Sequence, residues 1–322
     1  MERSDILYNE IETQIINELR SQALSQFKVI DLVKTGKLNN NDLIEKYKNK
    51  SIIHLNQEKT AYKVINHFVN KQVLCCMIVQ PTQSGKTGVM FALCKLFIEN
   101  PLYMINPTNM YIISGLSSTE WKNQTMERFP EIIMNNIYHR NNLDDFKMKL
   151  NQDPRNALII MDEIQIANTT GKTISKIFQE SNLYDINYLY EKNIKIVQFS
   201  ATPDGCYYDL KQWNECNYKI VIGEIDNKYV SAIDIYNDKR IFQSKPLVLN
   251  NKNTNPEEHK KISINIEEIK NILEERFNEP SYIIIRVSTN QDEYVNTISN
   301  IKSIFPEKLF NYVKYDQELN KI

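Results

Sequence analysis

The chain is poor in the residue types that build metal centres and disulfide frameworks. Its four histidines are scattered, and its five cysteines include no Cys-x-x-Cys pair: Cys75, Cys76, Cys94, Cys206 and Cys216. Scattered ligands argue against a zinc site. An odd number of cysteines, two of them in an apolar run, favours a reducing compartment. We therefore expect an intracellular protein, in the cytoplasm, the nucleus or a viral factory.

Long apolar runs are also missing. No run approaches the ~20 residues that cross a bilayer, and Met1 is followed by Glu-Arg-Ser-Asp, which is not a signal peptide. We expect no membrane partner. The net charge of −1 excludes a wholly basic surface but not a local basic cleft. With 322 residues, 42% of them hydrophobic, the chain can form one large or two ordinary domains.

Glycine is scarce as well, with seven residues in the chain. Three of them, Gly85, Gly88 and Gly115, fall in two short stretches that also carry other signals. Clustered use of a scarce, flexible residue indicates that the backbone approaches a ligand closely.

The first of these stretches, Val79–Gly88, has the pattern of a phosphate-binding loop. An apolar run at Val73–Val79 predicts a buried strand before it, and a helical pattern follows. Backbone N–H groups of such a loop and of the helix N-terminus point at phosphate oxygens. Lys86 places a positive charge at the terminal phosphates, and the Thr87 hydroxyl reaches Mg²⁺. The usual pattern has glycine where Gln80 stands, so the match is imperfect.

Polar side chains end two other predicted strands. Asp162 and Glu163 follow the apolar run 157–161, and Ser200–Pro203 follows the predicted buried strand 194–199. Ligands of a parallel α/β sheet bind at the carboxyl ends of its strands. We therefore expect Asp162 to hold Mg²⁺ and Glu163 to orient and deprotonate water. The structural alternative is a strand end with two solvated acids and an ordinary Ser/Thr turn.

Strands alternate with helices up to Pro203, which predicts an α/β fold with a parallel sheet covered by helices on both faces. The expected strands are 73–79, 110–114, 157–161 and 194–199. The expected helices are 5–28, a short one after Asn40, 57–70, one after Ser118, 130–138, 143–150 and 173–183. Further on we expect strands at 218–222 and 229–235, a polar linker, helices at 262–277 and 294–304, and strands at 281–287 and 309–313.

Taken in order, Gln83–Thr87, Asp162–Gln165 and Ser200–Thr202 resemble motifs I, II and III of the helicase superfamily 2 motor core. The resemblance implies a RecA-like domain that hydrolyses ATP with Mg²⁺ while it moves on nucleic acid. It implies nucleotide binding by Gln83, Ser84, Gly85, Lys86 and Thr87, and metal binding by Thr87 and Asp162. It implies catalysis by Lys86, Asp162 and Glu163, and coupling of the nucleotide to the motor by Gln165, Ser200 and Thr202.

Weaker likenesses to the same family extend the site. Ser114, Gly115 and Ser117 stand at the place of motif Ia, which touches the nucleic-acid backbone in this family, and Gln124 follows in the next helix. Hydroxyl and N–H groups suit phosphate contacts without sequence reading, although a capped helix start explains these residues nearly as well. Gln57 stands where related motors place a glutamine that reads adenine.

The chain departs from the family in what would be the second motor domain. Arg286–Thr289 stands at the place of motif IV, but no convincing motif V or VI follows, and the arginine finger of the family has no counterpart. We expect the second motor half to come from sequence beyond residue 322 or from a partner chain. On this hypothesis the chain alone binds nucleotide and hydrolyses it slowly.

The predicted organisation has four parts: an N-terminal helical extension (1–50), a RecA-like domain (51–240), a linker (241–261) and the start of a second α/β domain (262–322). The leading hypothesis is an ATP-dependent helicase or translocase that acts on nucleic acid, with DNA favoured over RNA. One alternative is the ATPase motor of a terminase-like DNA-packaging or restriction-type complex, with a nuclease domain elsewhere. Another is a non-catalytic nucleotide-binding scaffold, against which Lys86, Asp162 and Glu163 speak.

Overall fold

The structure is a computed structural model that describes residues 3–69, 73–163, 173–202, 210–213, 215 and 217–239, and the single positions 265, 267, 268, 271 and 299. The chain divides into two compact units, Met1–Ser231 and Ala232–Ile322. The predicted linker, Gln165 and Pro203 lie outside the described residues. So does the predicted second α/β pattern, apart from those single positions.

The first unit is built on a parallel sheet of six strands in the order β3-β2-β4-β5-β1-β6. The strands are β1 (Cys75–Val79), β2 (Met110–Ser114), β3 (Ile137–Tyr138), β4 (Ala157–Asp162), β5 (Ile194–Ser200) and β6 (Tyr218–Ile222). Every residue of β4 and β5 is buried, as is usual where helices cover both faces of a parallel sheet. This sheet confirms the predicted α/β class and the four predicted central strands.

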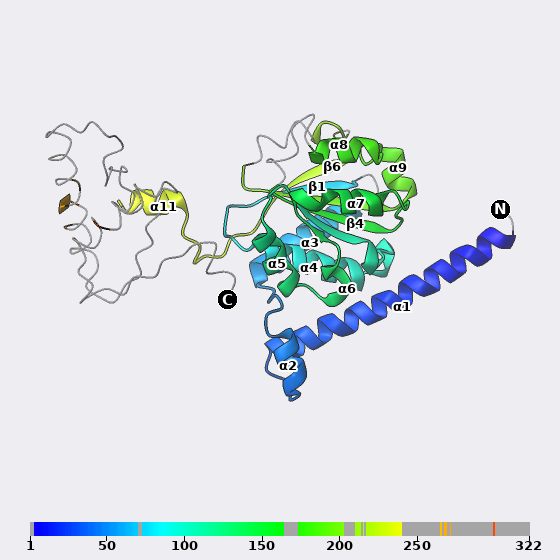
Figure 1. The fold of residues 1–322 in the computed structure, drawn as a ribbon, viewed down its shortest axis with the longest axis horizontal. Helices are drawn as coiled ribbons and strands as arrows, with labels where there is room; N and C mark the ends of the chain where they lie inside the picture. The colour runs from blue at the N-terminus through cyan, green and yellow to red at the C-terminus, as the bar shows by residue number, and fades with distance from the viewer. Residues whose placement is uncertain are drawn as a thin grey trace. The chain divides into compact units, whose positions relative to one another are not determined.

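Helices cover both faces of the sheet (Figure 1). One core cluster includes residues of α3 (Leu55–Val69), α4 (Lys86–Glu99) and α6 (Glu131–Met134). The opposite cluster includes residues of α7 (Leu143–Leu150), α8 (Thr173–Glu180) and α9 (Ile186–Glu191). Neighbouring strand residues enter opposite clusters, as Ile196 and Val197 of β5 do, because side chains alternate across a sheet.

The N-terminal helices belong to this first unit. They are α1 (Arg3–Lys34) and α2 (Asn41–Tyr47), and both were predicted. α1 turns Ala23, Phe27 and Ile30 toward the first core cluster at helical spacing, and the rings of Phe27 and Phe91 of α4 lie 5.1 Å apart. Arg20 donates a 2.7 Å hydrogen bond to the carbonyl oxygen of Ile98. It thereby satisfies one of the carbonyls that a helix leaves free at its C-terminus.

The predicted helix at 130–138 is wrong in its second half. The helix ends at Met134, and Ile137 and Tyr138 form β3 on the outer edge of β2. The reason lies in the intervening asparagines, whose side chains compete with the helical backbone. The side-chain amide of Asn136 donates to the backbone carbonyl oxygen of Thr108 at 2.7 Å, and the backbone carbonyl oxygen of Asn136 accepts from the N–H of Ile112 at 2.9 Å. These bonds stop the helix and start the strand pairing.

The predicted strand at 229–235 is also wrong. Residues 223–231 form neither helix nor strand, and α11 (Ala232–Asn237) follows. A turn at Asp226 explains the change, because its carboxylate accepts from the N–H of Lys228 at 2.8 Å and its carbonyl accepts from the N–H of Tyr229 at 3.0 Å. Such side-chain bonds to the local backbone replace the pairing that a strand needs.

The described α-helices range in length from four residues in α6 to 32 in α1. None of them combines the length and the apolar character that crossing a bilayer requires. The longest, α1, has a polar face and contributes to the core of the first unit with only part of its surface.

Candidate functional site

The phosphate loop, Gln80–Thr87, connects β1 to α4 at the carboxyl edge of the sheet. Its backbone is left-handed at Gln83 (φ +58°) and Gly85 (φ +93°), and α4 begins at Lys86. Glycine adopts this conformation freely, whereas another residue pays roughly 1–2 kcal/mol. The Ser84 hydroxyl donates to the carbonyl oxygen of Pro81 at 2.6 Å, which closes the loop on itself. The expected strand–loop–helix geometry is present.

Gln80 takes the position at which the usual loop has glycine. Its side chain is fully buried, and its amide nitrogen donates to the carbonyl oxygens of Ser84 and Glu224, both at 3.3 Å. Gly223 makes room for it, because a Cβ at that position would lie 3.0 Å from the amide carbon of Gln80. The departure from glycine in the loop is therefore matched by a glycine after β6, and the amide ties the loop to that segment.

Gln57 of α3 lies against the start of α4. Its amide nitrogen donates to the carbonyl oxygen of Gly85 at 3.1 Å, and its amide oxygen accepts from the N–H of His54 at 2.9 Å. Both glycines of the loop region leave space for this amide, since a Cβ at Gly85 or Gly88 would lie 2.4 or 2.3 Å from it. The structure thus brings Gln57 to the loop, while its contact with adenine stays a prediction.

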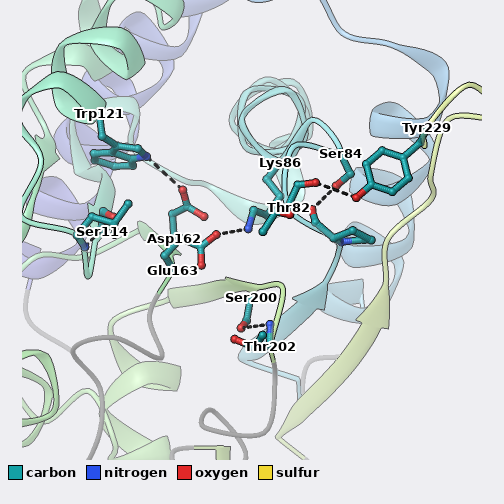
Figure 2. Close-up of polar contacts among 12 residues, drawn as sticks. Thr82, Ser84, Lys86, Ser114, Trp121, Asp162, Glu163, Ser200, Thr202 and Tyr229 are labelled. Atoms are coloured by element: carbon teal, nitrogen blue, oxygen red, sulfur yellow. Dashed lines mark hydrogen bonds and ion pairs between the residues drawn. The ribbon is translucent and has the colours of Figure 1, made fainter. Parts of the chain in front are cut away.

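The two acidic residues at the end of β4 face the phosphate loop. Figure 2 shows the carboxylate of Glu163 directed at the Lys86 ammonium, with which it forms an ion pair. Asp162 lies beside this pair and is 6% exposed. The backbone of Glu163 is left-handed (φ +49°), a conformation that costs of order 1–3 kcal/mol in a residue other than glycine. Lys86 and Glu163 are 77 positions apart in sequence, so the fold alone brings them together.

Asp162 has an unusual environment for a carboxylate. Burial raises its pKa to about 6, Lys86 opposes this change and Glu163 adds to it. Oδ2 accepts from the indole N–H of Trp121 at 3.3 Å (Figure 2). Oδ1 is buried and has no hydrogen-bond partner among the residues that the structure describes. A buried polar atom without a partner destabilises the fold, and a ligand can satisfy it.

Thr87 and Asp162 are the predicted metal ligands. No group of three or more His, Cys, Asp and Glu side chains that could hold a metal ion occurs within the described part of the chain. Mg²⁺ does not need such a group, because it keeps several waters and takes other ligands from substrate phosphates. A free carboxylate oxygen at Asp162 and a partly exposed hydroxyl residue at the start of α4 therefore fit Mg²⁺ that arrives with a nucleotide.

The predicted coupling residues stand at the end of β5. Ser200 is level with Val79 of β1, and its carbonyl accepts from the N–H of Gln80 at 3.1 Å. The Ser200 hydroxyl accepts from the N–H of Thr202 at 3.1 Å. Figure 2 shows this pair in the same close-up as Lys86 and Glu163. Gln165 lies outside the described residues, and the coupling role stays a prediction.

The predicted nucleic-acid contacts divide into two pairs. Ser114 is fully buried and its hydroxyl accepts from the N–H two residues later, at 3.2 Å. The N–H of Gly115 donates to the carbonyl oxygen of Asp162 at 3.1 Å. Ser117 and Gln124 are exposed. Only the latter pair presents side chains to a polymer, while the former pair holds the turn after β2 against the end of β4.

Two aromatic residues of the site were missed at the level of sequence. Trp121 comes from α5 (Thr119–Arg128), 41 positions before its partner Asp162. Tyr229 donates from its hydroxyl to the carbonyl oxygen of Thr82 at 3.0 Å, across 147 positions. Neither contact belongs to a local motif. The one available signal is a large aromatic ring within the otherwise polar stretch that forms α5.

Comparisons with known proteins show no family for this chain. No family model matches it, and no curated protein matches it. Among solved structures, PCH-2 of C. elegans is similar at 11% sequence identity and a TM-score of 0.25, over 85% of this chain and 73% of that chain. At this TM-score, the likeness supports no conclusion about the fold or the function of the chain. The structure itself shows a RecA-like parallel α/β sheet with a strand–loop–helix segment at Lys86, and it does not single out a family within that class.

Proposed function

We propose that the chain binds a nucleoside triphosphate, ATP, with Mg²⁺ at the phosphate loop and hydrolyses it. The observation that carries this proposal is the meeting of Lys86, Asp162 and Glu163 at one edge of the sheet. A lysine at a helix N-terminus, a buried carboxylate with a free oxygen and a second carboxylate beside it are the groups that phosphoryl transfer to water requires.

Each residue has a distinct part in the proposed reaction. The loop backbone and the N-terminus of α4 bind the phosphate chain. Lys86 exchanges its partner Glu163 for phosphate oxygens and offsets the charge that develops on them. Glu163, released from Lys86, orients a water molecule and accepts its proton. Asp162 offers its free oxygen to the metal site, and bound Mg²⁺ supplies further charge stabilisation at the phosphates.

In this proposal, hydrolysis serves movement on nucleic acid, as in the superfamily 2 helicases and translocases that the motifs resemble, with DNA favoured over RNA. The support is positional. The segment after β2 carries the exposed Ser117 and Gln124, and its Gly115 N–H bonds the backbone of Asp162. Hydroxyl and amide groups bind phosphate oxygens without reading sequence. A polymer bound there would lie next to the hydrolytic groups.

The test measures phosphate release from ATP by the purified chain, with and without Mg²⁺, for wild type and for Lys86→Ala and Glu163→Gln. Each variant is expected to lower the rate by roughly 10²–10⁴-fold, because it removes charge stabilisation or the general base. Lys63→Ala is the matched control, since Lys63 forms an ion pair with Glu224 on the exposed surface of the same unit. Equal rates for Lys86→Ala and Lys63→Ala would refute hydrolysis at this site.

The polymer part of the proposal has its own test. Single-stranded DNA and RNA oligonucleotides of one sequence are titrated into the chain, and turnover and binding are recorded at two salt concentrations. Binding is expected to weaken with salt, because phosphate contacts release counterions. Gln124→Ala should weaken binding more than the exposed control Gln14→Ala on α1. Turnover that no nucleic acid changes would leave an ATPase without the motor function.

A further inference from the structure

Trp121 holds the carboxylate of Asp162 in one orientation. Its indole N–H, a group that only donates hydrogen bonds, bonds Oδ2 at 3.3 Å, as Figure 2 shows. The other oxygen, Oδ1, is buried and unpartnered within the described part of the chain. The bond therefore decides which oxygen of the carboxylate is occupied and which one stays free for a ligand.

Trp121 is itself fixed by its helix. Its backbone N–H donates to the Ser118 hydroxyl at 3.0 Å, which caps the N-terminus of α5, and its carbonyl accepts from the Thr125 hydroxyl at 2.7 Å. Its ring packs against the first core cluster. Because hydrogen bonds hold its backbone in α5 and packing holds its ring, Trp121 moves with its helix, and a displacement of α5 reaches the indole N–H.

The segment that carries Trp121 touches Asp162 twice. The N–H of Gly115 bonds the carbonyl oxygen of Asp162 at 3.1 Å, and the indole of Trp121 bonds its carboxylate. Ser117 lies between these two contacts, and Gln124 lies three positions after Trp121 on α5; both are exposed. A polymer that binds Ser117 and Gln124 therefore acts on a segment that makes two hydrogen bonds to Asp162, one to its backbone and one to its carboxylate.

We propose that Trp121 is a positioning residue that orients Asp162 toward a metal–nucleotide complex and transmits displacement of residues 115–124 to that carboxylate. The inference rests on the proposed function, since it takes Asp162 as the residue at the metal. It goes further by naming the side chain through which polymer binding reaches the hydrolytic groups.

The chain offers a matched control for this role. Trp213, its other tryptophan, is 1% exposed and donates its indole N–H to the carbonyl oxygen of Leu183 at 3.0 Å, within the opposite core cluster. Trp121→Phe and Trp213→Phe each remove one indole hydrogen bond and keep an aromatic ring. Only the first change touches Asp162, so a difference between the two isolates that contact from ring packing.

The experiment uses the full chain and a fluorescent ADP analogue, titrated at increasing Mg²⁺ concentrations. Trp121→Phe is expected to raise the Mg²⁺ concentration at half-maximal binding roughly fivefold over Trp213→Phe, the equivalent of one lost hydrogen bond. In Trp213→Phe, where Trp121 is the remaining tryptophan, its emission should change on addition of ADP with Mg²⁺ and not with EDTA. Stimulation of ATP turnover by a single-stranded oligonucleotide should fall in Trp121→Phe and persist in the control.

Each outcome supports or overturns the inference. The inference would be overturned, with nucleotide binding intact, by equal Mg²⁺ midpoints in the two variants. It would also be overturned if the emission of Trp121 did not change on addition of Mg²⁺ with ADP. A wild-type chain that binds no nucleotide would remove the proposed function and the inference with it. If Trp121→Phe fails to fold, the emission of Trp121 in the control variant decides by itself: a change on addition of Mg²⁺ with ADP that EDTA abolishes supports the inference, and an unchanged emission overturns it.

Discussion

The contact between Gln57 and Gly88 makes a quantitative prediction for Gly88→Ala. A Cβ at this position would lie 2.3 Å from Oε1 of Gln57 and 2.4 Å from its amide carbon and nitrogen. No van der Waals contact is that short, so the amide must leave its place. It then loses its bond to the carbonyl oxygen of Gly85 and the bond it accepts from the N–H of His54.

The free energies follow from these two bonds. At about 1 kcal/mol each, Gln57→Ala should lower the free energy of unfolding by about 2 kcal/mol. Gly88→Ala loses the same bonds but gains up to about 1 kcal/mol of helix propensity, so its net cost is about 1 kcal/mol. The double variant has no amide to displace, and it should also cost about 1 kcal/mol. Additivity would give about 3 kcal/mol, so the coupling is about 2 kcal/mol.

Urea unfolding followed by tryptophan fluorescence measures this coupling. Both tryptophans, Trp121 and Trp213, belong to the first unit, so the signal reports the part of the chain that carries the contact. Gly36→Ala is the control, because Gly36 has a left-handed backbone (φ +66°) and a Cβ there would meet nothing within 4 Å. Its cost should add to that of Gln57→Ala within about 0.5 kcal/mol. Additive costs for Gly88→Ala and Gln57→Ala would refute the contact.

Three other substitutions test other features of the first unit. Burial lowers the pKa of Lys195 from 10.5 to about 8. At pH 7, Lys195→Met should therefore raise the free energy of unfolding, measured in urea, by about 3 kcal/mol over wild type. This difference should shrink between pH 8 and 10.5, because the lysine of folded wild type is then neutral and wild type regains stability. Burial raises the pKa of Asp162 from 3.8 to about 6, so Asp162→Asn should raise the free energy of unfolding at pH 7 by about 3 kcal/mol over wild type. That gain should fade between pH 6 and 3.8 as wild type takes up its proton, and a constant gain over this range would contradict the assigned pKa. Tyr229→Phe removes the hydroxyl bond to Thr82, and titration with the ADP analogue should show binding weakened by at most about fivefold.

The central strands could be predicted from the sequence because the sheet buries them on both faces. β1, β2 and β4 are continuous apolar runs, and β5 is mostly apolar, with Lys195 and Gln198 as its polar exceptions; each strand ends where polar residues mark the carboxyl edge. The two-residue strand β3 has no such run and depends on hydrogen bonds of Asn136 that no local pattern reveals.

The residues at the edge of the sheet could be predicted as a group, but their contacts could not. The spacing of motifs places Lys86 after β1 and Glu163 after β4, at the same edge of the sheet on either side of β5, and the structure joins them in an ion pair. The left-handed backbone of Glu163 and the indole bond of Trp121 depend on packing between segments far apart in the chain. Sequence periodicity describes one helix or strand at a time, so it gives no information on contacts between distant segments.

Several destabilising features lie at the edge of the sheet that carries the phosphate loop. Asp162 is buried with a free oxygen and a raised pKa, and next to it Glu163 has a left-handed backbone. Across from them Gln80, buried in the loop, leaves its amide oxygen without a partner among the described residues. The two apolar core clusters on the faces of the sheet offset these local costs. Strain and unmet hydrogen bonds persist where a ligand relieves them. Because the costs meet at the phosphate loop, a bound phosphate chain with its cation would satisfy the free oxygen of Asp162 and draw Lys86 from Glu163, so ligand binding there should also stabilise the first unit.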